Sequence, residues 1–271
     1  MYSKLFAGFF ALSTLATFGD DFATKGRGIL EKNAPAVLTV QVFLKMTYGG
    51  SSSPNESKED LTGTVVDASG LTVLALSACD PSELYQRIMS EEYSKAKVQT
   101  EVTDIKMVLD DGTEIPCEIV LRDKDLDLAF IRPKSKPATP LPFVDLAKSS
   151  PAQALDQLLA LYRLNGAAGR SCAGALERVS AIIKKPRTMY IPESTMTGTT
   201  RGAPAFALDG NLVGLFVTRA ISAKGASSRN YRNSVTAIIL PADDILKAAR
   251  QAPEGKPQTE EPAAGATPAS K

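Results

Sequence analysis

Histidine is absent from all 271 residues of the chain, and this absence limits the chemistry that the chain can perform. The imidazole of histidine is the commonest general acid and base in enzymes and the commonest protein ligand for transition metals. The sequence therefore excludes Ser-His-Asp catalysis, Cys-His catalysis and zinc sites that depend on histidine. A serine nucleophile would need another base, such as a lysine.

The three cysteines, Cys79, Cys117 and Cys172, are widely spaced and include no CxxC pair, so they match no zinc-binding pattern. An odd number leaves at least one thiol unpaired in an exported chain. We interpret all three as small core residues, with a Cys79–Cys117 disulfide as the alternative. We expect no metal and no cofactor.

The composition is that of an ordinary globular protein. Hydrophobic residues make up 44% of the chain and charged residues 23%, which argues against a mostly disordered or fibrous chain. There are 31 basic and 30 acidic residues, so the formal net charge is +1. This balance gives no electrostatic signature of binding to nucleic acid or to an anionic membrane.

The two ends of the chain differ in composition from its body. Lys4 precedes an apolar run at 5–18, and small residues follow the core of that run. This layout predicts a secretory signal peptide at 1–19, and thus a secreted or periplasmic protein of a bacterial envelope. A buried N-terminal helix is the alternative, and the run is too short to span a membrane comfortably. The tail at 252–271 is rich in proline and alanine, which predicts disorder.

The body of the chain, 29–251, has mainly the patterns of β-strands. Residues 37–46 alternate between apolar and polar, and glycine turns at 67–70 and 110–112 predict two hairpins. Residues 48–60 are polar and are expected to form a loop, and helices are expected at 81–95 and from Pro241 onward. Strands are expected at 37–46, 62–67, 71–77, 102–109, 113–122, 126–132, 158–164, 172–183, 203–207, 211–218 and 234–240. Many short strands with regular turns predict a sandwich or barrel.

Four segments, in order, resemble the trypsin-like serine proteases, specifically their HtrA (Deg) branch. Residues 62–71 are similar to the strand–turn–strand segment that precedes the catalytic histidine of the family. Residues 108–117 and 125–131 look like the hairpin and strand that carry the catalytic aspartate. Residues 199–214 are similar to the nucleophile segment, and 235–245 to the last strand and helix.

The resemblance implies an all-β fold of two six-stranded Greek-key β-barrels with a C-terminal helix. The first barrel would occupy 29–137, and the second barrel with its closing helix would occupy 143–251. The usual PDZ domain of the HtrA branch is not expected in this chain, which has the short tail in its place.

The resemblance also assigns the catalytic positions of the family to residues of this chain. The histidine position falls at Ser77, or at Ala78 if the register slips by one residue, and neither side chain accepts a proton near neutral pH. The aspartate position falls at Asp127. The nucleophile position falls at Arg201, and arginine is permanently protonated and cannot attack a carbonyl.

The oxyanion loop of the family corresponds to Thr199, Thr200 and Arg201, with Thr199 in the place of a glycine that helps to shape the oxyanion hole. Asp127 is then either a structural carboxylate or the partner of Arg201 in an ion pair across the former cleft. Alternatively, Arg201 points into solvent. The basic residues at 184–187, Arg229 and Arg232 are interpreted as solvated loop charges, with a binding patch as the alternative.

These replacements predict an exported pseudoprotease that recognises a protein or peptide, or serves as a scaffold, without proteolysis. One alternative is a serine hydrolase with a displaced active site, with Ser180, Ser194, Ser227 or Ser228 as nucleophile and a lysine as base. The other alternative is a chaperone similar to HtrA. We expect no nucleic-acid partner and no membrane span after signal removal.

Overall fold

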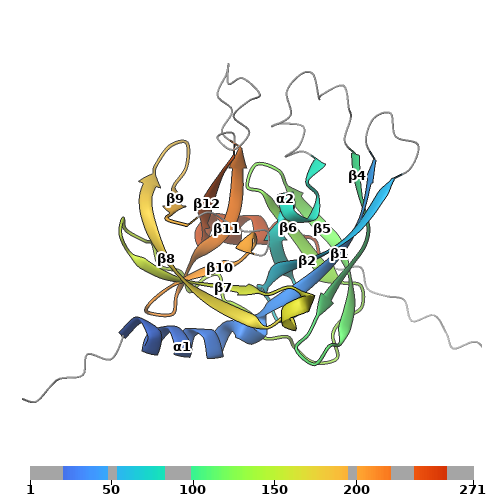
Figure 1. The fold of residues 1–271 in the computed structure, drawn as a ribbon, viewed down its shortest axis with the longest axis horizontal. Helices are drawn as coiled ribbons and strands as arrows, with labels where there is room; N and C mark the ends of the chain where they lie inside the picture. Colours follow the sequence, from blue (N-terminus) through green and yellow to red (C-terminus); the bar gives the residue numbers. More distant parts are fainter. Residues whose placement is uncertain (1–20, 48–53, 83–98, 195–199, 221–234, 255–271) are drawn as a thin grey trace, which may run out of the picture.

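The structure is a computed structural model, and it describes residues 21–47, 54–82, 99–194, 200–220 and 235–254. Twelve strands within these ranges form two closed antiparallel barrels that lie side by side (Figure 1). The predicted fold class is thereby confirmed. The expected signal peptide at 1–19 and nearly all of the predicted helix at 81–95 and tail at 252–271 lie outside the described residues.

Both barrels have the same strand connectivity. The first has the order β1-β2-β3-β6-β5-β4 and the second β7-β8-β9-β12-β11-β10, which is the same permutation of six consecutive strands. The strands of the first barrel are β1 (Val37–Thr47), β2 (Asn55–Val65), β3 (Thr72–Ala75), β4 (Gln99–Val108), β5 (Glu114–Asp123) and β6 (Leu128–Pro133). The strands of the second barrel are β7 (Gln157–Arg163), β8 (Cys172–Ile183), β9 (Met189–Pro192), β10 (Pro204–Ala207), β11 (Leu212–Ala220) and β12 (Val235–Pro241).

Residues 55–60 of the polar segment at 48–60 belong to a strand, contrary to the predicted loop, and residues 48–53 lie outside the described residues. β2 begins at Asn55, and its first half pairs with β1 from Asn55 opposite Met46 to Asp60 opposite Gln41. This half of β2 is mostly exposed. A strand that buries little of either face shows no apolar alternation, so the pattern on which the prediction relied is missing here.

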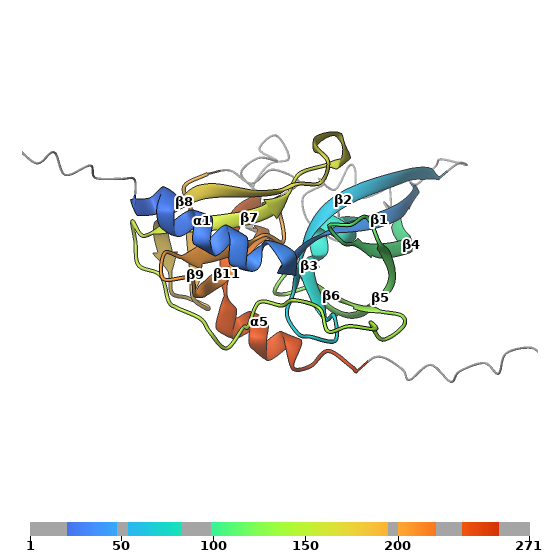
Figure 2. The same ribbon diagram turned by 90° about the horizontal axis from the view of Figure 1, so that it is seen from below.

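Helices cover the outside of the second barrel. α1 (Asp21–Asn33), which no sequence signal predicted, places Ile29 in one apolar cluster with Leu159 and Leu161 of β7. Residues 29–33 therefore belong to a helix on the second barrel and not to the first barrel. α5 (Ala242–Ala249) follows β12 directly, as predicted (Figure 2), and its residues Ile245 and Ala248 are buried. A 3-10 turn, η1 (Ala34–Ala36), connects α1 to β1, and another, η2 (Gly166–Ala168), lies between β7 and β8.

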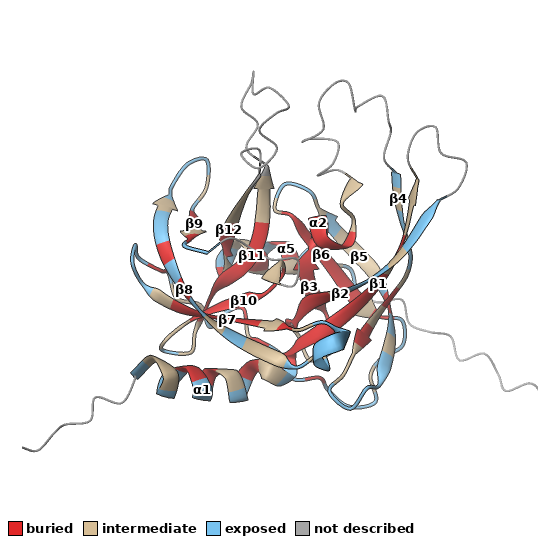
Figure 3. Ribbon diagram, viewed as in Figure 1, coloured by how far each residue is buried: buried red, intermediate tan, exposed pale blue. Residues whose placement is uncertain are grey.

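The two barrels share part of their core. One apolar cluster joins Val73 and Phe130 of the first barrel to Phe206 and Leu215 of the second. Each barrel also has a separate buried cluster inside it (Figure 3). Because protein interiors are closely packed, this continuous cluster fixes the position of one barrel relative to the other. Side chains at the junction are therefore positioned by both barrels.

Candidate functional site at the barrel junction

Asp127 lies at the junction, in the turn that leads into β6, and its carboxylate binds groups from both barrels. Oδ1 accepts the backbone N–H of Ser77 at 2.7 Å, and Oδ2 accepts the Ser77 hydroxyl at 2.9 Å. Oδ2 also accepts the backbone N–H of Thr218, on β11 of the second barrel, at 2.7 Å. The carboxylate therefore links strands that are far apart in the sequence.

The backbone around Asp127 is held in an unusual conformation. Asp127 has a φ of 59°, in the left-handed region that aspartate tolerates better than most residues. The Asp123 carboxylate accepts the N–H groups of Asp125 and Leu126, which closes the turn. The Asp127 carbonyl accepts the N–H of Leu76 at 2.9 Å. These bonds fix the direction in which the Asp127 side chain points.

Burial dominates the electrostatics of Asp127, of which only 9% is exposed. Desolvation raises the pKa of this carboxyl to about 6, even though the bonds from Thr218 and Ser77 and the charge of Arg201 act to lower it. A carboxyl with a pKa near 6 is partly protonated in mildly acidic solution. Perturbed groups of this kind occur at functional sites and in structural networks alike.

Ser77, the predicted equivalent of the family's histidine, belongs to the one-turn helix α2 (Leu76–Cys79) that follows β3. The residue is 6% exposed, and both its N–H and its hydroxyl donate to Asp127. Its neighbour Ala78, the alternative position, is also buried and belongs to the core of the first barrel. Ser77 thus supplies two hydrogen-bond donors to the Asp127 carboxylate from a buried position.

Arg201, the predicted equivalent of the nucleophile, does not form the ion pair with Asp127 that one alternative expected. Its Nη1 donates to the main-chain carbonyl of Ser77 at 3.3 Å. The side chain is half-buried at the same junction, so it does not simply extend into solvent either. Ser77, Asp127 and Arg201 therefore form one chain of contacts, as their assignment to a common site predicted. Of the other oxyanion-loop positions, Thr200 is described and Thr199 is not.

Gly202 places the loop of Arg201 against the first barrel. Its φ is +87°, and a Cβ at this position would lie 2.6 Å from the carbonyl oxygen of Thr62. Its N–H donates to the Phe216 carbonyl at 2.7 Å, and the Ala203 N–H donates to the Thr200 carbonyl at 3.1 Å. Only glycine combines this conformation with this approach of two backbones.

A second carboxylate of the same turn, Asp125, binds two arginines of the second barrel. Arg187 pairs with its Oδ2, and Arg219 donates to its main-chain oxygen at 2.5 Å and lies 3.5 Å from Oδ1. Arg187 thus has an ion-pair partner in addition to its partial exposure in a loop, Lys184 and Lys185 are exposed as interpreted, and Arg229 and Arg232 lie outside the described residues. Asp125 and Asp127 together attach the β5–β6 turn to the second barrel.

Sequence reasoning missed Glu177, a buried carboxylate on β8. It is 5% exposed and accepts the N–H groups of Glu193 and Ser194 at 2.8 and 3.1 Å. It also accepts the hydroxyl of Ser194, one of the candidate displaced nucleophiles. Ser180, another candidate, is exposed on β8, and Ser227 and Ser228 are not described. Neither described serine has a lysine partner within the described part of the chain.

The cysteines are free thiols in the structure. Cys79 and Cys117 are buried in the core of the first barrel, as interpreted, and do not form the alternative disulfide. Desolvation raises the pKa of each of these two thiols to about 12, which keeps them protonated and unreactive. Cys172 is half-buried at the start of β8.

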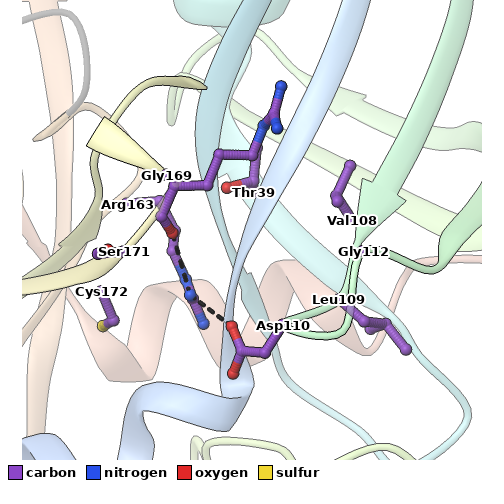
Figure 4. Close-up of a pocket in the computed structure, with 10 residues that line it drawn as sticks. Thr39, Val108, Leu109, Asp110, Gly112, Arg163, Gly169, Ser171 and Cys172 are labelled. Carbon is purple, nitrogen blue, oxygen red and sulfur yellow. Dashed lines mark hydrogen bonds and ion pairs between the residues drawn. The ribbon is translucent and has the colours of Figure 1, made fainter. Parts of the chain in front are cut away.

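A cavity of about 390 Å³ lies on another side of the junction, between β1 and the turns that follow β4 and β7 (Figure 4). Arg163 of β7 lines it, is 7% exposed, and pairs with Asp110 of the β4–β5 turn at 2.5 Å. The guanidinium also donates to the carbonyls of Val37, Ala34 and Arg170. Arg163 is therefore a cross-link between the barrels whose donors are largely used by the protein itself.

No group of histidine, cysteine, aspartate and glutamate side chains that could hold a metal ion occurs in the described ranges. None of the described helices is long and apolar enough to span a membrane.

Comparisons with known proteins agree with the barrel topology. The model of a family described as "Trypsin-like peptidase domain" matches residues 61–215, more than half of the chain. Among solved structures, the chain is similar to the crystal structure of the MamO protease domain from Magnetospirillum magneticum in its apo form. The TM-score is 0.51 at 15% sequence identity, covering 80% of this chain and 96% of the other, a similarity that concerns the fold. No curated protein matches the chain.

Proposed function

The chain belongs to the trypsin-like peptidase domain family, and we propose that it is a pseudoprotease, which binds a protein or peptide without cleaving it. The observation that carries this proposal is that both carboxylate oxygens of Asp127 accept hydrogen bonds from Ser77 and Thr218. In a working triad the carboxylate orients an imidazole, which then takes the proton of the nucleophile. Here the donors to the carboxylate are two backbone N–H groups and one hydroxyl.

The neighbouring groups support the same proposal. The chain has no histidine that could act as the base. At the nucleophile position, the guanidinium of Arg201 has no lone pair for attack on a carbonyl. The contacts of Ser77, Asp127 and Arg201 instead join the two barrels. The surface at this junction can bind a ligand even when catalysis is lost.

The Ser77 hydroxyl is not a substitute nucleophile in this proposal. It donates to a carboxyl whose pKa is near 6, an arrangement that could in principle activate an alcohol. However, Ser77 is only 6% exposed, so a substrate carbonyl has no access to its oxygen.

A displaced hydrolase remains the second candidate, because the Ser194 hydroxyl binds the buried carboxylate of Glu177. A serine next to a carboxylate acceptor has part of the arrangement of an activated nucleophile. Glu177 also accepts three backbone N–H groups, two of them from Glu193 and Ser194, which favours a structural role for it in holding the segment that precedes the Arg201 loop.

Labelling with a fluorophosphonate probe distinguishes the two candidates. We expect the folded, purified protein to show no mass increase after incubation with the probe, because no serine in it is activated. The Ser194→Ala variant is the matched control for nonspecific labelling. Labelling of the unmodified protein that disappears in this variant would replace the pseudoprotease with the displaced hydrolase.

Export is part of the same proposal. Lys4 and the apolar run at 5–18 support a cleaved signal peptide and function in a bacterial envelope. The mature protein isolated from its source is then expected to begin between Thr17 and Asp21, as determined by N-terminal sequencing. Soluble protein that retains Met1 would contradict export.

A further inference from the structure

We infer that Arg201 makes the barrel junction a receptor for a carboxylate group of a bound peptide. This inference rests on the proposed binding function and adds the chemistry of the ligand. The first observation is that Arg201 forms no ion pair within the described part of the chain. One of its nitrogens, Nη1, donates to an uncharged acceptor, the Ser77 carbonyl. A guanidinium has five N–H donors and stays charged at all relevant pH values.

The nearby carboxylates form no ion pair with Arg201, although its charge acts on the pKa of Asp127. Asp127 uses both of its oxygens for Ser77 and Thr218, and its raised pKa reduces its negative charge in mildly acidic solution. Asp125 is shared by Arg187 and Arg219. Of the three arginines at this side of the junction, Arg187 and Arg219 each pair with Asp125, whereas Arg201 forms no ion pair with a carboxylate of the described residues.

The backbone presents Arg201 from a fixed turn. Gly202, the next residue, donates its N–H to Phe216 and contacts the backbone of the first barrel, while Ala203 donates to Thr200. A side chain that starts from an ordered turn loses less entropy when it binds a ligand. Its carbonyl contact with Ser77 further orients the guanidinium.

A carboxylate is the peptide group that matches this arrangement. Guanidinium and carboxylate form two parallel hydrogen bonds, and such charge-assisted bonds are roughly twice as strong as neutral ones. In a peptide the carboxylate comes either from an Asp or Glu side chain or from the C-terminus. Both sources supply the same chemistry, and the experiment separates them.

The experiment measures fluorescence polarisation of labelled nine-residue peptide pools with the full mature chain. The central residue is fixed as Glu, Gln or Lys, the other positions are mixed neutral residues, and each pool is made with a free and with an amidated C-terminus. The proteins are the unmodified chain, Arg201→Ala, Arg201→Lys and the control Arg178→Ala, which removes an exposed arginine of β8. Far-ultraviolet circular dichroism verifies that each variant is folded.

We expect the Glu pool, or any pool with a free C-terminus, to bind about ten- to a hundredfold more tightly than its uncharged match. Arg201→Ala should abolish this preference, Arg201→Lys should keep part of it, and Arg178→Ala should leave it unchanged. A preference for Glu in amidated pools identifies a side-chain carboxylate, and a preference for free C-termini identifies the terminal one. Added sodium acetate at high concentration should weaken the preferred binding.

Two results would overturn the inference, and they differ in what they leave standing. If all pools bind equally and Arg201→Ala binds like the unmodified chain, the carboxylate receptor is wrong while peptide binding stands. If no pool binds at all, both the receptor and the proposed peptide-binding function fail.

Discussion

Asp127 is a buried carboxylate that accepts hydrogen bonds from both barrels, and its pH behaviour follows from its burial. Desolvation raises its pKa from the ordinary value of 3.8 to about 6. Between about pH 4 and pH 6 the folded protein therefore binds more protons at this site than the unfolded chain does. The contribution of Asp127 to stability is present below this window and decreases as the pH rises through it.

We predict that the Asp127→Asn variant lacks this dependence. The difference in free energy of unfolding, unmodified protein minus variant, should fall by up to roughly 3 kcal/mol between pH 4 and pH 6.5. Urea unfolding at several pH values measures it. Asparagine tolerates the left-handed φ of this position, so the variant should fold. A difference that stays constant with pH would show that the carboxyl is not desolvated as described.

Gly202 provides a second test at the scale of one residue, with Gly210 as its matched control. Both glycines have nearly the same φ, +87° and +86°, but a Cβ at Gly202 would meet Thr62 O at 2.6 Å, whereas nothing lies within 4 Å at Gly210. Gly210→Ala should cost about 1–2 kcal/mol of unfolding free energy from backbone strain. Gly202→Ala should cost about 1–3 kcal/mol more, because the two barrels must also move apart. Equal losses in thermal or urea unfolding would contradict the close contact between the Arg201 loop and the first barrel.

At the scale of elements, Arg163 joins β7 to the first barrel. Its guanidinium binds Asp110 and the carbonyls of Val37 and Ala34, which lie on the other side of the junction. Arg163→Met should lower the free energy of unfolding by about 2–4 kcal/mol, because it leaves buried acceptors without a donor. Arg178→Met, on the exposed face of β8, should change it by less than about 0.5 kcal/mol. If both variants unfold at the same urea concentration, Arg163 is not a cross-link.

The strands and turns of this fold were largely predictable from the sequence, for an identifiable reason. The hairpin turns contain Gly70 and Gly112, which have φ values of 93° and 84°, and glycine is the residue that such turns require. β1 has one face in the barrel core, so its apolar residues alternate. The sequence signals fail where an element buries few side chains or is very short. The first half of β2 is mostly exposed, β9 has only four residues, and α1 buries only a narrow stripe of residues.

The site was predictable only in part. The order of four motifs identified Ser77, Asp127 and Arg201 as neighbours, and the structure brings them together. The bond from Thr218 to Asp127 joins residues 91 positions apart, and the pairing of Arg187 with Asp125 spans 62 positions. Such contacts depend on the relative position of the two barrels, which no local pattern encodes.

At the scale of the whole molecule, two barrels of equal topology share one core cluster and several polar links. Asp127 with Thr218, Asp125 with Arg219, and Arg163 with Asp110 all cross the junction. In the proposed pseudoprotease these links fix the surface that presents Arg201. In that proposal Asp127, at the aspartate position that the resemblance assigns, attaches the two barrels to each other instead of taking part in proton transfer.

The most direct test of this account is a measurement of hydrolysis by the unmodified mature protein, purified to homogeneity over several columns. The substrates are casein and small peptide esters, and the fractions are assayed across each elution peak. Because there is no histidine base and Asp127 is occupied by Ser77 and Thr218, we predict no turnover above the buffer background. Turnover that follows the protein through every column and is abolished by a serine-directed inhibitor would contradict the account.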